Sequence, residues 1–548
     1  MAVTTTVSAQ REFLQSEAGR LAERLRAAIQ GEVRFDDGSR ALYSADASNY
    51  RRIPIGVVVP KTIDDIVETV RACRDFGAPI LPRGGGTSMC GQSVNVAVVI
   101  DASKYLNRVL QVDSTNHCAI VEPGVVCDAL RDAAEEHALT FAPDPSTHSR
   151  CTLGGMIGNN SCGPHSVMAG KTEENIEALE VLTYDGARFW VGPTGDAELE
   201  QIIREGGRRG EIYAGLKALR DKYADEIRAK FPNIRRRVSG YSLNQLLPEN
   251  GFNVARALVG TEGTCALTLR AKTTLVHSPQ ERVMLALGYP DIYLAGDAVP
   301  QVMVSSKPIA LEGVGEGIVG GLRERGLKLD DIALLPDGNG WLLVEFGSDT
   351  REAAVAQARA LMEELQRGSE PPDMRLIADP KMQARVWSIR ELGTSATQMS
   401  EIAGEPDAIV GWEDAAVDPM RVGDYLREFQ KLIDRYGYKT SLLGHFGDGC
   451  IHARINFDLR SRQGLRTWRE FLTEAAQLVV KYGGSINGEH GDGQAKAEFL
   501  PIMYGESLME AFRQFKEIWD PQHKMNPRNL INPHRIEENL RMGPDYQP

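Results

Sequence analysis

The sequence predicts a protein of mixed α and β structure, built from two or three domains. Its 548 residues exceed the length at which a single hydrophobic core usually stops growing. Between residues 55 and 275, short β-branched runs alternate with amphipathic helical segments, which is typical of an α/β or α+β domain. From 279 to 440, a strand-like run and a long helical run indicate a second α+β domain.

The first domain begins with a predicted strand over 55–60 (IGVVVP) and a helix over 62–77. Thr62 and Asp65 have the spacing of a capping box at the start of this helix, and apolar residues recur along one helical face. Two further apolar runs, 79–82 and 96–101, predict buried strands, and the segment 118–125 leads into a second predicted helix over 126–138.

The second domain is expected to contain a strand with the sequence WLLVEFG and the long helix that follows it. Glycine and histidine become dense from residue 441 onward, and a last helix leads into an end rich in proline and asparagine. We therefore divide the chain into a helical lead-in over 1–50, a first domain over 51–278, a second domain over 279–505 and a C-terminal tail over 506–548.

Composition and charge narrow the classes of function. The net charge of −13 and the lack of a long basic run argue against nucleic acid or an anionic membrane as partners. The first residues lack an apolar signal core, and no stretch approaches about 18 apolar residues, so we expect no transmembrane segment. The eight cysteines form no C-x-x-C pair, which disfavours a zinc or iron–sulfur site within this chain and is typical of reduced thiols in a cytoplasmic protein.

A glycine-rich loop, Pro82–Gln92 (PRGGGTSMCGQ), follows directly on a predicted strand. Three consecutive glycines permit positive φ and remove every Cβ, so that backbone amides can converge on an anion. Thr87 and Ser88 add hydroxyl groups, and a pyrophosphate fits such a loop. A tight turn between a strand and a helix would explain the glycines equally well.

Two further segments have the same character. In Pro143–Ser166, three glycines leave space because they lack side chains, and asparagine and serine side chains supply hydrogen bonds. The segment is too long for a simple turn. Such a run is able to line a large planar cofactor that needs close backbone approach and polar edge contacts. The shorter segment Val259–Leu267 (VGTEGTCAL) is similar.

Two histidines and a glutamate form a candidate metal site. His445 and His452 are seven residues apart, a spacing that places them on opposite faces of a plain strand. The glycine-containing segment 447–449 between them is able to bend the chain, so that both imidazoles turn inward. With Glu489 they make a set of three ligands that leaves an open position for catalysis. The alternative to a metal site is that both histidines make ordinary hydrogen bonds beside a turn.

Together, these segments resemble the FAD-binding domain of the vanillyl-alcohol oxidase / p-cresol methylhydroxylase superfamily, and within it the FAD-linked D-lactate and D-2-hydroxyglutarate dehydrogenases. The resemblance covers residues 40 to 535 approximately. It implies an α+β architecture with a two-subdomain FAD-binding domain of the PCMH type. It also implies a ferredoxin-like α+β substrate (cap) domain, and a C-terminal helical tail that returns to the FAD domain.

The resemblance also assigns the cofactor-binding residues. Covalent members often have a histidine in the glycine loop, and because Thr87 stands at that place we expect non-covalent FAD. The family's terminal Asn-Pro motif matches Asn526 or, alternatively, Asn532. The positions that match the family's FAD contacts are Arg83, Gly84, Gly85, Gly86, Thr87, Ser88, Gly91, Gln92, Pro143, Ser146, Thr152, Gly155, Asn159, Ser161, Glu262, Gly263 and Asn526.

In the resembling dehydrogenases the positions of His445, His452 and Glu489 bind zinc or a similar divalent ion, and the next histidine, here His490, is the base. The metal is expected to polarise the C2 hydroxyl of the substrate, and His490 to remove its proton. The C2 hydride then passes to the flavin.

Substrate binding requires a carboxylate anchor, and the family places an arginine at the position of Arg390, in a helical run over 386–395. A surface salt bridge is the alternative role for this residue. Members specific for 2-hydroxyglutarate carry a lysine at Gly411 or Trp412, and an asparagine at Arg454. Arg454 is therefore expected to hold a distal carboxylate, or the C1 carboxylate together with Arg390, and the choice of substrate stays open.

The leading hypothesis is a metal-dependent, FAD-linked dehydrogenase of a D-2-hydroxy acid, with D-lactate and D-2-hydroxyglutarate as the candidate substrates. An oxidase that passes electrons to oxygen is a close variant. A non-redox flavin transferase, similar to the alkyl-glycerone-phosphate synthases, has the same fold. The end of the chain resembles a junction that precedes an iron–sulfur domain in larger proteins, so a flavin subunit that needs an iron–sulfur partner is a third hypothesis.

Overall fold

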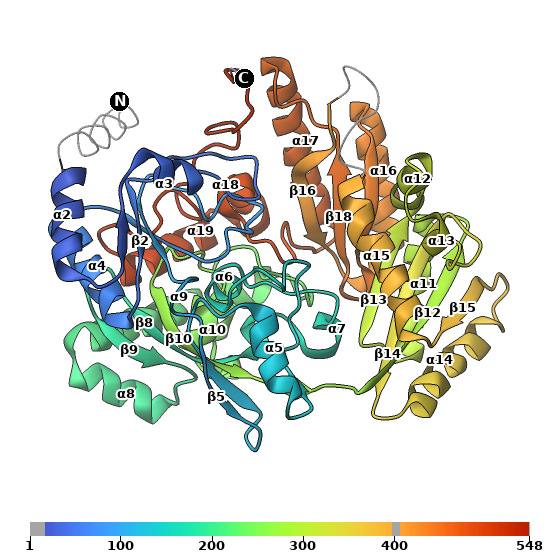
Figure 1. Ribbon diagram of the computed structural model, residues 1–548, viewed down its shortest axis with the longest axis horizontal. Coiled ribbons are helices and arrows are strands. Elements are labelled where there is room, and N and C mark those ends of the chain that lie inside the picture. The colour runs from blue at the N-terminus through green and yellow to red at the C-terminus, as the bar shows by residue number, and fades with distance from the viewer. Residues whose placement is uncertain (1–16, 397–405, 547–548) are drawn as a thin grey trace.

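The chain forms two bodies that lie side by side, one coloured blue to green in Figure 1 and the other yellow to orange. This computed structural model describes residues 17–396 and 406–546. Residues up to His277 build the first body from three sheets, whereas residues from Glu281 onward build a single seven-stranded sheet. The final segment returns to the first body, and the α+β architecture that the sequence predicts is confirmed.

The first sheet has the strand order β1-β2-β4-β3, with β1 antiparallel to three parallel strands. The predicted capping box is present, since Thr62 and Asp65 each bond the backbone of the other at the start of α4. Helices α2 and α4 bury their apolar faces against this sheet. The elements are α2 (Ala18–Ala28), β1 (Glu32–Arg34), α3 (Asp37–Leu42), β2 (Gly56–Val59), α4 (Ile63–Asp75), β3 (Ile80–Arg83) and β4 (Val98–Asp101).

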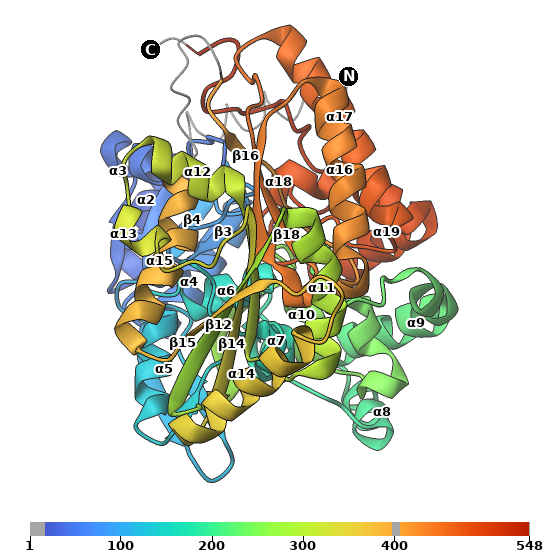
Figure 2. The same cartoon turned by 90° about the vertical axis from the view of Figure 1, so that its right-hand side faces the viewer.

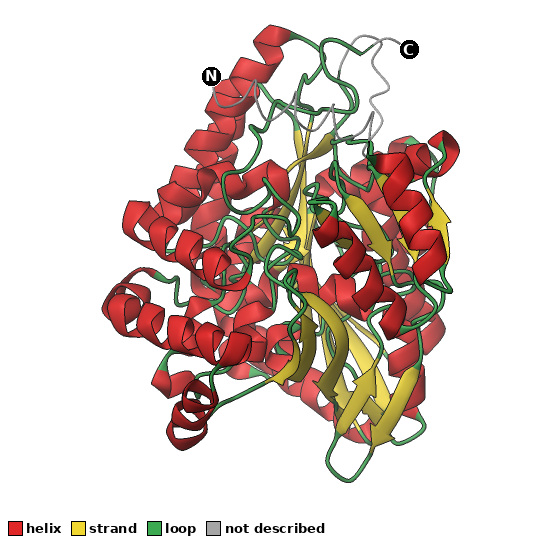
Figure 3. Ribbon diagram, turned by 90° about the vertical axis from the view of Figure 1, so that its left-hand side faces the viewer, coloured by secondary structure: helices red, strands yellow, loops and turns green. Residues whose placement is uncertain are grey.

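The second sheet is antiparallel, in the order β5-β6-β10-β8-β9, and Figure 3 shows this body from the side with its helices in red. A two-stranded ladder of β7 and β11 lies at the exit to the second body. The strands are β5 (Val109–Asp113), β6 (Cys118–Val121), β7 (Leu139–Thr140), β8 (Ile176–Leu182), β9 (Arg188–Val191), β10 (Leu267–Thr274) and β11 (Val276–His277). The helices are α5 (Cys127–Glu135), α6 (Leu153–Asn159), α7 (Ser166–Ala169), α8 (Asp196–Glu205), α9 (Gly207–Lys230) and α10 (Val254–Leu258).

The second body starts with a β-α-β-β-α-β unit whose strands have the order β15-β12-β14-β13, which is the ferredoxin-like arrangement that we predicted. Alternate residues of β12 pack on opposite faces: Leu285 contacts the core under α11 and α14, and Met284 the core under α12 and α15 (Figure 2). The elements are β12 (Glu281–Tyr289), α11 (Ile292–Ser305), β13 (Ala310–Gly315), α12 (Glu316–Glu324), α13 (Leu329–Ile332), β14 (Gly340–Ser348), α14 (Arg351–Leu365), β15 (Asp373–Ile377) and α15 (Pro380–Ala396).

A second, incomplete unit of the same type continues the sheet through β17, β18 and β16. The fourth strand of a ferredoxin-like unit pairs with its first strand, here β16. In this chain the segment after α17 makes one bridge there, Ala416 to Ser485, and then leaves the sheet as a loop over 487–492. The elements are β16 (Ile409–Ala416), α16 (Val422–Tyr436), β17 (Thr440–His445), β18 (Cys450–Ile455) and α17 (Arg462–Lys481).

The C-terminal segment contains α18 (Gly493–Lys496) and α19 (Leu500–Trp519). Gly505 has a non-helical backbone and divides α19 into two parts. The segment then returns to the first body, where Ile80 donates its amide to Lys524 and Tyr50 pairs with Leu540. In the described ranges, no helix is both long and apolar enough to cross a membrane.

A buried histidine connects the two bodies. His165, from the first body, contacts Asp144 of that body through Nδ1, and its Nε2 lies 2.6 Å from Oε2 of Glu345 on β14. Arg131 and Arg282 lie at the outer sides of the two carboxylates. Burial lowers the pKa of His165, but the charges of Asp144 and Glu345 outweigh it and raise the pKa to about 10. The imidazolium is therefore bound between two carboxylates.

We expect His165→Gln to destabilise the protein by about 3 to 5 kcal/mol near neutral pH, since it removes the cation between two buried carboxylates and leaves them with the more distant Arg131 and Arg282. A folded pKa of about 10 against the ordinary 6.5 means that this stabilisation is complete below pH 6.5 and is lost as the pH rises towards 10. Thermal unfolding should therefore separate wild type and variant strongly near pH 6, and much less above about pH 9.

His277→Gln is the control, because His277 is exposed and pairs with Asp349 at the surface. A difference between wild type and His165→Gln that does not change with pH would contradict a charged His165.

Candidate functional site

A cavity that is open to solvent lies between the two subdomains of the first body, and the space free of protein atoms within it and its mouth is about 1440 Å³. Its walls come from all three glycine-containing segments that the sequence singles out, and from the loop that carries Glu489 and His490. Of the predicted cofactor residues, those that line it are Arg83, Gly84, Gly85, Gly86, Thr87, Ser88, Gln92, Ser146, Thr152, Gly155, Asn159, Ser161, Glu262 and Gly263.

The glycines of the first loop are required by close packing. A Cβ on Gly84 would lie 2.0 Å from Oγ1 of Thr152, and one on Gly85 would lie 2.6 Å from the carbonyl of Arg150. Gly86 has a φ of +67°, which side chains rarely adopt. Among the described residues, the backbone amides of 85–88 donate to no protein group. Unpaired amides on a loop without Cβ atoms fit a phosphate group.

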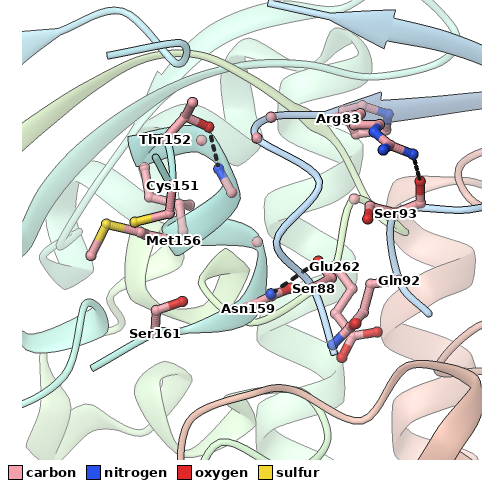
Figure 4. Close-up of a pocket in the computed structure, with 18 of the residues that line it drawn as sticks. Arg83, Ser88, Gln92, Ser93, Cys151, Thr152, Met156, Asn159, Ser161 and Glu262 are labelled. Atoms are coloured by element: carbon pink, nitrogen blue, oxygen red, sulfur yellow. Dashed lines mark hydrogen bonds between the residues drawn. The ribbon is translucent and has the colours of Figure 1, made fainter. Parts of the chain in front are cut away.

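The second segment forms α6, which starts at the N-cap Thr152 and ends where Asn160 adopts the left-handed conformation. The Asn160 side chain is held by Glu173, with 3.0 Å between Nδ2 and Oε2. Asn159 points into the cavity region and bonds Oγ of Ser88 at 3.4 Å, which joins the first and second segments (Figure 4). The two segments thus form one polar edge of the cavity.

Three predicted cofactor residues lie outside the cavity wall. Gly91 packs against Tyr50, and Pro143 offers its carbonyl to the thiol of Cys127. Asn526 is fully buried, and its Nδ2 donates to the carbonyls of Gln92 (3.0 Å) and Glu262 (2.8 Å). It therefore braces two lining segments from behind, whereas the alternative match, Asn532, is exposed.

The two candidate metal histidines are brought together by a hairpin. His445 ends β17 and pairs with Cys450, so His452, two residues further on β18, shares its face of the sheet. Gly449 permits the reversal, with a φ of +73° and no room for a Cβ against the carbonyl of Val417. The bend that we predicted is thus a full chain reversal, and the two rings lie 5.1 Å apart between centroids.

Glu489 completes the set. One ligand atom from each of His445, His452 and Glu489 lies within 4.8 Å of the others. Oε2 of Glu489 is 3.3 Å from Nε2 of His445, and Oε1 is 3.2 Å from Nε2 of His452. The other nitrogen of His445 bonds Glu312 on β13 at 2.7 Å, which is the carboxylate–histidine arrangement common behind metal ligands.

His490 lies beside this set and also lines the cavity between the two subdomains. Its Nε2 is 3.0 Å from Oε1 of Glu489, and its ring stacks at 5.4 Å on that of His452. Burial lowers the pKa of His452 to about 4, so this imidazole is neutral, as a metal ligand must be. Burial alone raises the pKa of Glu489, but His445 and bonds from three imidazoles hold it well below its usual range.

Asp414 fixes the loop that carries Glu489 and His490. Its Oδ2 accepts the backbone amides of Gly488 (3.2 Å), Glu489 (3.0 Å) and His490 (2.8 Å), and Lys496 neutralises it at 2.7 Å. Asp414 itself has a φ of +58°, in a strand that bulges on either side of Trp412. A residue that the sequence gave no reason to select therefore positions two of the candidate site residues.

The two candidate anchor arginines are both engaged with a carboxylate. Arg390 on α15 pairs with Oε2 of Glu312 at 2.5 Å, and its Nη2 lies 3.4 Å from Nδ1 of His445. It is therefore buried beside the histidines rather than in a surface salt bridge. Arg454 pairs with Glu413 of the neighbouring strand β16.

Arg236 is a further charged residue at the site, and sequence reasoning missed it. It is fully buried, and its guanidinium bonds Oε2 of Glu489 (2.9 Å), Asp448 (3.2 Å) and the thiol of Cys162 (2.8 Å). The sequence indicates Arg236 only through the run of three arginines at 235–237, and such a run is typical of a cluster of charges in solvent. The sequence indicates Glu312 more clearly, because it is a single carboxylate within an apolar strand-like run, and a buried carboxylate needs a partner.

Comparisons with known proteins identify the domains of this chain. Residues 54–192 match the family described as an FAD binding domain, and residues 278–530 match the family described as FAD linked oxidases, C-terminal domain. The fold resembles a solved alkyldihydroxyacetonephosphate synthase, with a TM-score of 0.61 at 15% identity over 93% of this chain and 84% of that one.

Among curated proteins, the chain is 30% identical over 530 residues to a D-2-hydroxyglutarate dehydrogenase of Pseudomonas putida. This match covers 93% of the chain but 52% of the relative, so the chain spans about half the length of that protein. A D-lactate dehydrogenase of Archaeoglobus fulgidus is 27% identical, with 91% of this chain and 95% of that one covered.

We expect Arg236→Met to lower the free energy of unfolding by about 3 to 5 kcal/mol, because it leaves Asp448 and Glu489 buried without this cation. Arg235→Met is a matched control, since the neighbouring arginine is half-exposed and should cost less than about 1 kcal/mol. Denaturant unfolding of both variants checks the difference, and equal losses would show that Arg236 has no special role in the network.

Proposed function

Because the chain belongs to the FAD linked oxidases and carries their FAD binding and C-terminal domains, we propose that it oxidises a D-2-hydroxy acid to the 2-oxo acid. The observation that carries the proposal is the position of His490. It lines the cavity formed by the FAD-binding segments and, at the same time, lies 3.0 Å from Glu489 of the candidate metal set. A base placed between a flavin and a metal serves the oxidation of an alcohol directly.

Two bound groups are implied. FAD, held non-covalently at the loop that contains Thr87, supplies the acceptor of two electrons and a proton from C2. A divalent ion, for which we propose zinc, supplies a Lewis acid for the C2 hydroxyl. The nitrogen and oxygen donors of His445, His452 and Glu489, and the carboxylate behind His445, are the ligand types that such an ion takes.

The protein's own part is to remove a proton and to hold the acid. His490 accepts the hydroxyl proton, and the three amides bound by Asp414 keep its backbone in place. Arg390 is the proposed anchor of the C1 carboxylate, since its guanidinium lies beside His445. The dehydrogenases named among the relatives support this reaction class.

A non-redox flavin transferase is the second candidate, because the solved synthase has the same fold. The candidate metal set favours oxidation, since a metal at a hydroxyl group lowers its pKa. The acceptor of the electrons is proposed to be a separate group or protein of the iron–sulfur type. The greater length of the Pseudomonas putida relative leaves room for such a part.

Replacement of the base tests the mechanism. We expect His490→Ala to retain bound yellow flavin but to lose its reduction by a D-2-hydroxy acid, by a factor of about 100 to 10,000 in rate. Anaerobic stopped-flow absorbance measures this step without an electron acceptor. His523→Ala, at an exposed histidine, should behave as wild type. Reduction of the flavin in His490→Ala at the wild-type rate would exclude His490 as the base.

Removal of the metal tests the ligand set. We expect chelation to abolish flavin reduction while FAD stays bound, and zinc to restore it. His452→Ala should lower zinc affinity more than 100-fold, because it removes one of three protein ligands. Equilibrium dialysis with metal analysis measures binding independently of activity. A metal-free protein with full activity would overturn the metal proposal and leave the flavin proposal intact.

A further inference from the structure

Two cysteines lie opposite each other at the wall of the FAD cavity, and the proposed oxidation uses neither of them. Val126 and Thr152 form an antiparallel bridge, so Cys127 and Cys151, one position further along, face each other across the same two segments. The amide of Cys127 donates to the carbonyl of Cys151 at 3.0 Å. Opposed residues of such a ladder have Cα atoms about 5.5 Å apart, which is also a usual Cα separation in disulfides.

The two thiols are free and contact each other. The bond between them is the main reason why the pKa of Cys151 is lowered, and a bond to Thr147 lowers it further against the opposing effect of burial. The same bond, together with burial, raises the pKa of Cys127 well above its ordinary value. Because the thiolate is the reactive form, Cys151 is the nucleophile of the pair.

The pair has one reachable member and one buried member. Cys151 lines the FAD cavity, where Figure 4 shows its sulfur, whereas Cys127 is fully buried behind it. Cys162 also lines this cavity, but its thiol donates to the carbonyl of Gly488 at 3.3 Å and lies 2.8 Å from Nη1 of Arg236. A small reagent in the cavity therefore meets Cys151 with a second thiol directly behind it.

The backbone around Cys151 supports the glycine loop that we assign to phosphate binding. A Cβ on Gly85 would lie 3.6 Å from Cα of Cys151, and one on Gly84 would lie 2.0 Å from Oγ1 of Thr152. A disulfide brings its two sulfurs to about 2.05 Å, so its formation draws Cys151 towards Cys127 beneath this loop. Oxidation of the pair and binding of FAD thus act on the same piece of backbone.

We propose that Cys127 and Cys151 are a site of reversible oxidation, which forms a disulfide in the FAD-free protein and which bound FAD protects. The oxidant is a small disulfide. The thiolate of Cys151 attacks one of its sulfurs and releases the first thiol, and Cys127, after loss of its proton, attacks the sulfur of Cys151 and releases the second thiol. Two electrons and two protons thus pass from the cysteine pair to the reagent. The proposal rests on the binding of FAD at this cavity and not on the reaction proposed for it.

The test exposes the full chain, with and without FAD, to bis(2-hydroxyethyl) disulfide and maps the products by alkylation and mass spectrometry. The FAD-free protein should lose two hydrogens and yield one cross-linked pair of peptides that contain Cys127 and Cys151. FAD at about 100 times its Kd should slow this oxidation about 100-fold, because only the FAD-free fraction reacts. Reaction at Cys162 would differ, since it adds the mass of the reagent.

Substitutions separate the two roles. Cys127→Ser should accumulate the mixed disulfide on Cys151, and Cys151→Ser should leave Cys127 unmodified. Cys118→Ser is the matched control, because it changes another buried cysteine of the same subdomain, on β6, and it should oxidise as wild type does.

Titration of FAD, followed by flavin fluorescence, provides a second readout that needs no turnover. The oxidised protein should bind FAD more weakly than the reduced protein, and by reciprocity FAD should shift the oxidation equilibrium by the same factor. Oxidation at the same rate with and without FAD would overturn the proposal, as would oxidation of other cysteines while Cys127 and Cys151 stay open to alkylation. Failure of a D-2-hydroxy acid to reduce the flavin would contradict the proposed function and leave this test unaffected.

Discussion

The candidate site depends on one carboxylate, Asp414, and the three backbone amides that it binds. The loop over 488–490 leaves the sheet where a ferredoxin-like unit would place a fourth strand, so the amides of Glu489 and His490 lose the ladder partners that a strand would provide, while the amide of Gly488 still donates to the carbonyl of Asp414. Asp414 replaces those partners, and its own positive φ turns it towards the loop. Lys496 neutralises it in the interior. The missing strand and the functional loop are thus one feature.

The same loop is held from the first body. Glu262, which lines the flavin cavity, accepts the amides of Asp492 and Gly493, and Gln92 donates to the carbonyl of His490 at 2.6 Å. Asn526 then fixes both Glu262 and Gln92. Residues predicted as cofactor contacts therefore also position the proposed base. The flavin-binding segments and the loop that carries His490 are thus joined by hydrogen bonds of the protein itself.

Sequence patterns predicted the parts of this structure that depend on local chemistry. The capping box at Thr62 and the glycine loop follow from residue spacing, whereas the ferredoxin-like arrangement was expected from the family resemblance. The hairpin that unites His445 and His452 was only partly predicted, because the reversal depends on strand pairing. Arg236 and Asp414 could not be predicted, since their partners lie at least 70 residues away in the chain and the pairs carry no local signal.

Buried charge in this region is better explained by function than by stability. Apolar residues at the positions of Glu312, Arg236 and Asp414 would avoid the cost of desolvation, and buried ion pairs are often neutral or unfavourable for stability. Here each charge contacts a candidate metal ligand or the loop that bears one. His445 and bonds from three imidazoles hold the pKa of Glu489 well below its usual range, Arg236 pairs with its carboxylate, and Asp414 holds its backbone. The buried charged residues thus cluster where a carboxylate must be kept charged, oriented and close to two imidazoles. Such a cluster of buried charges is typical of an active site.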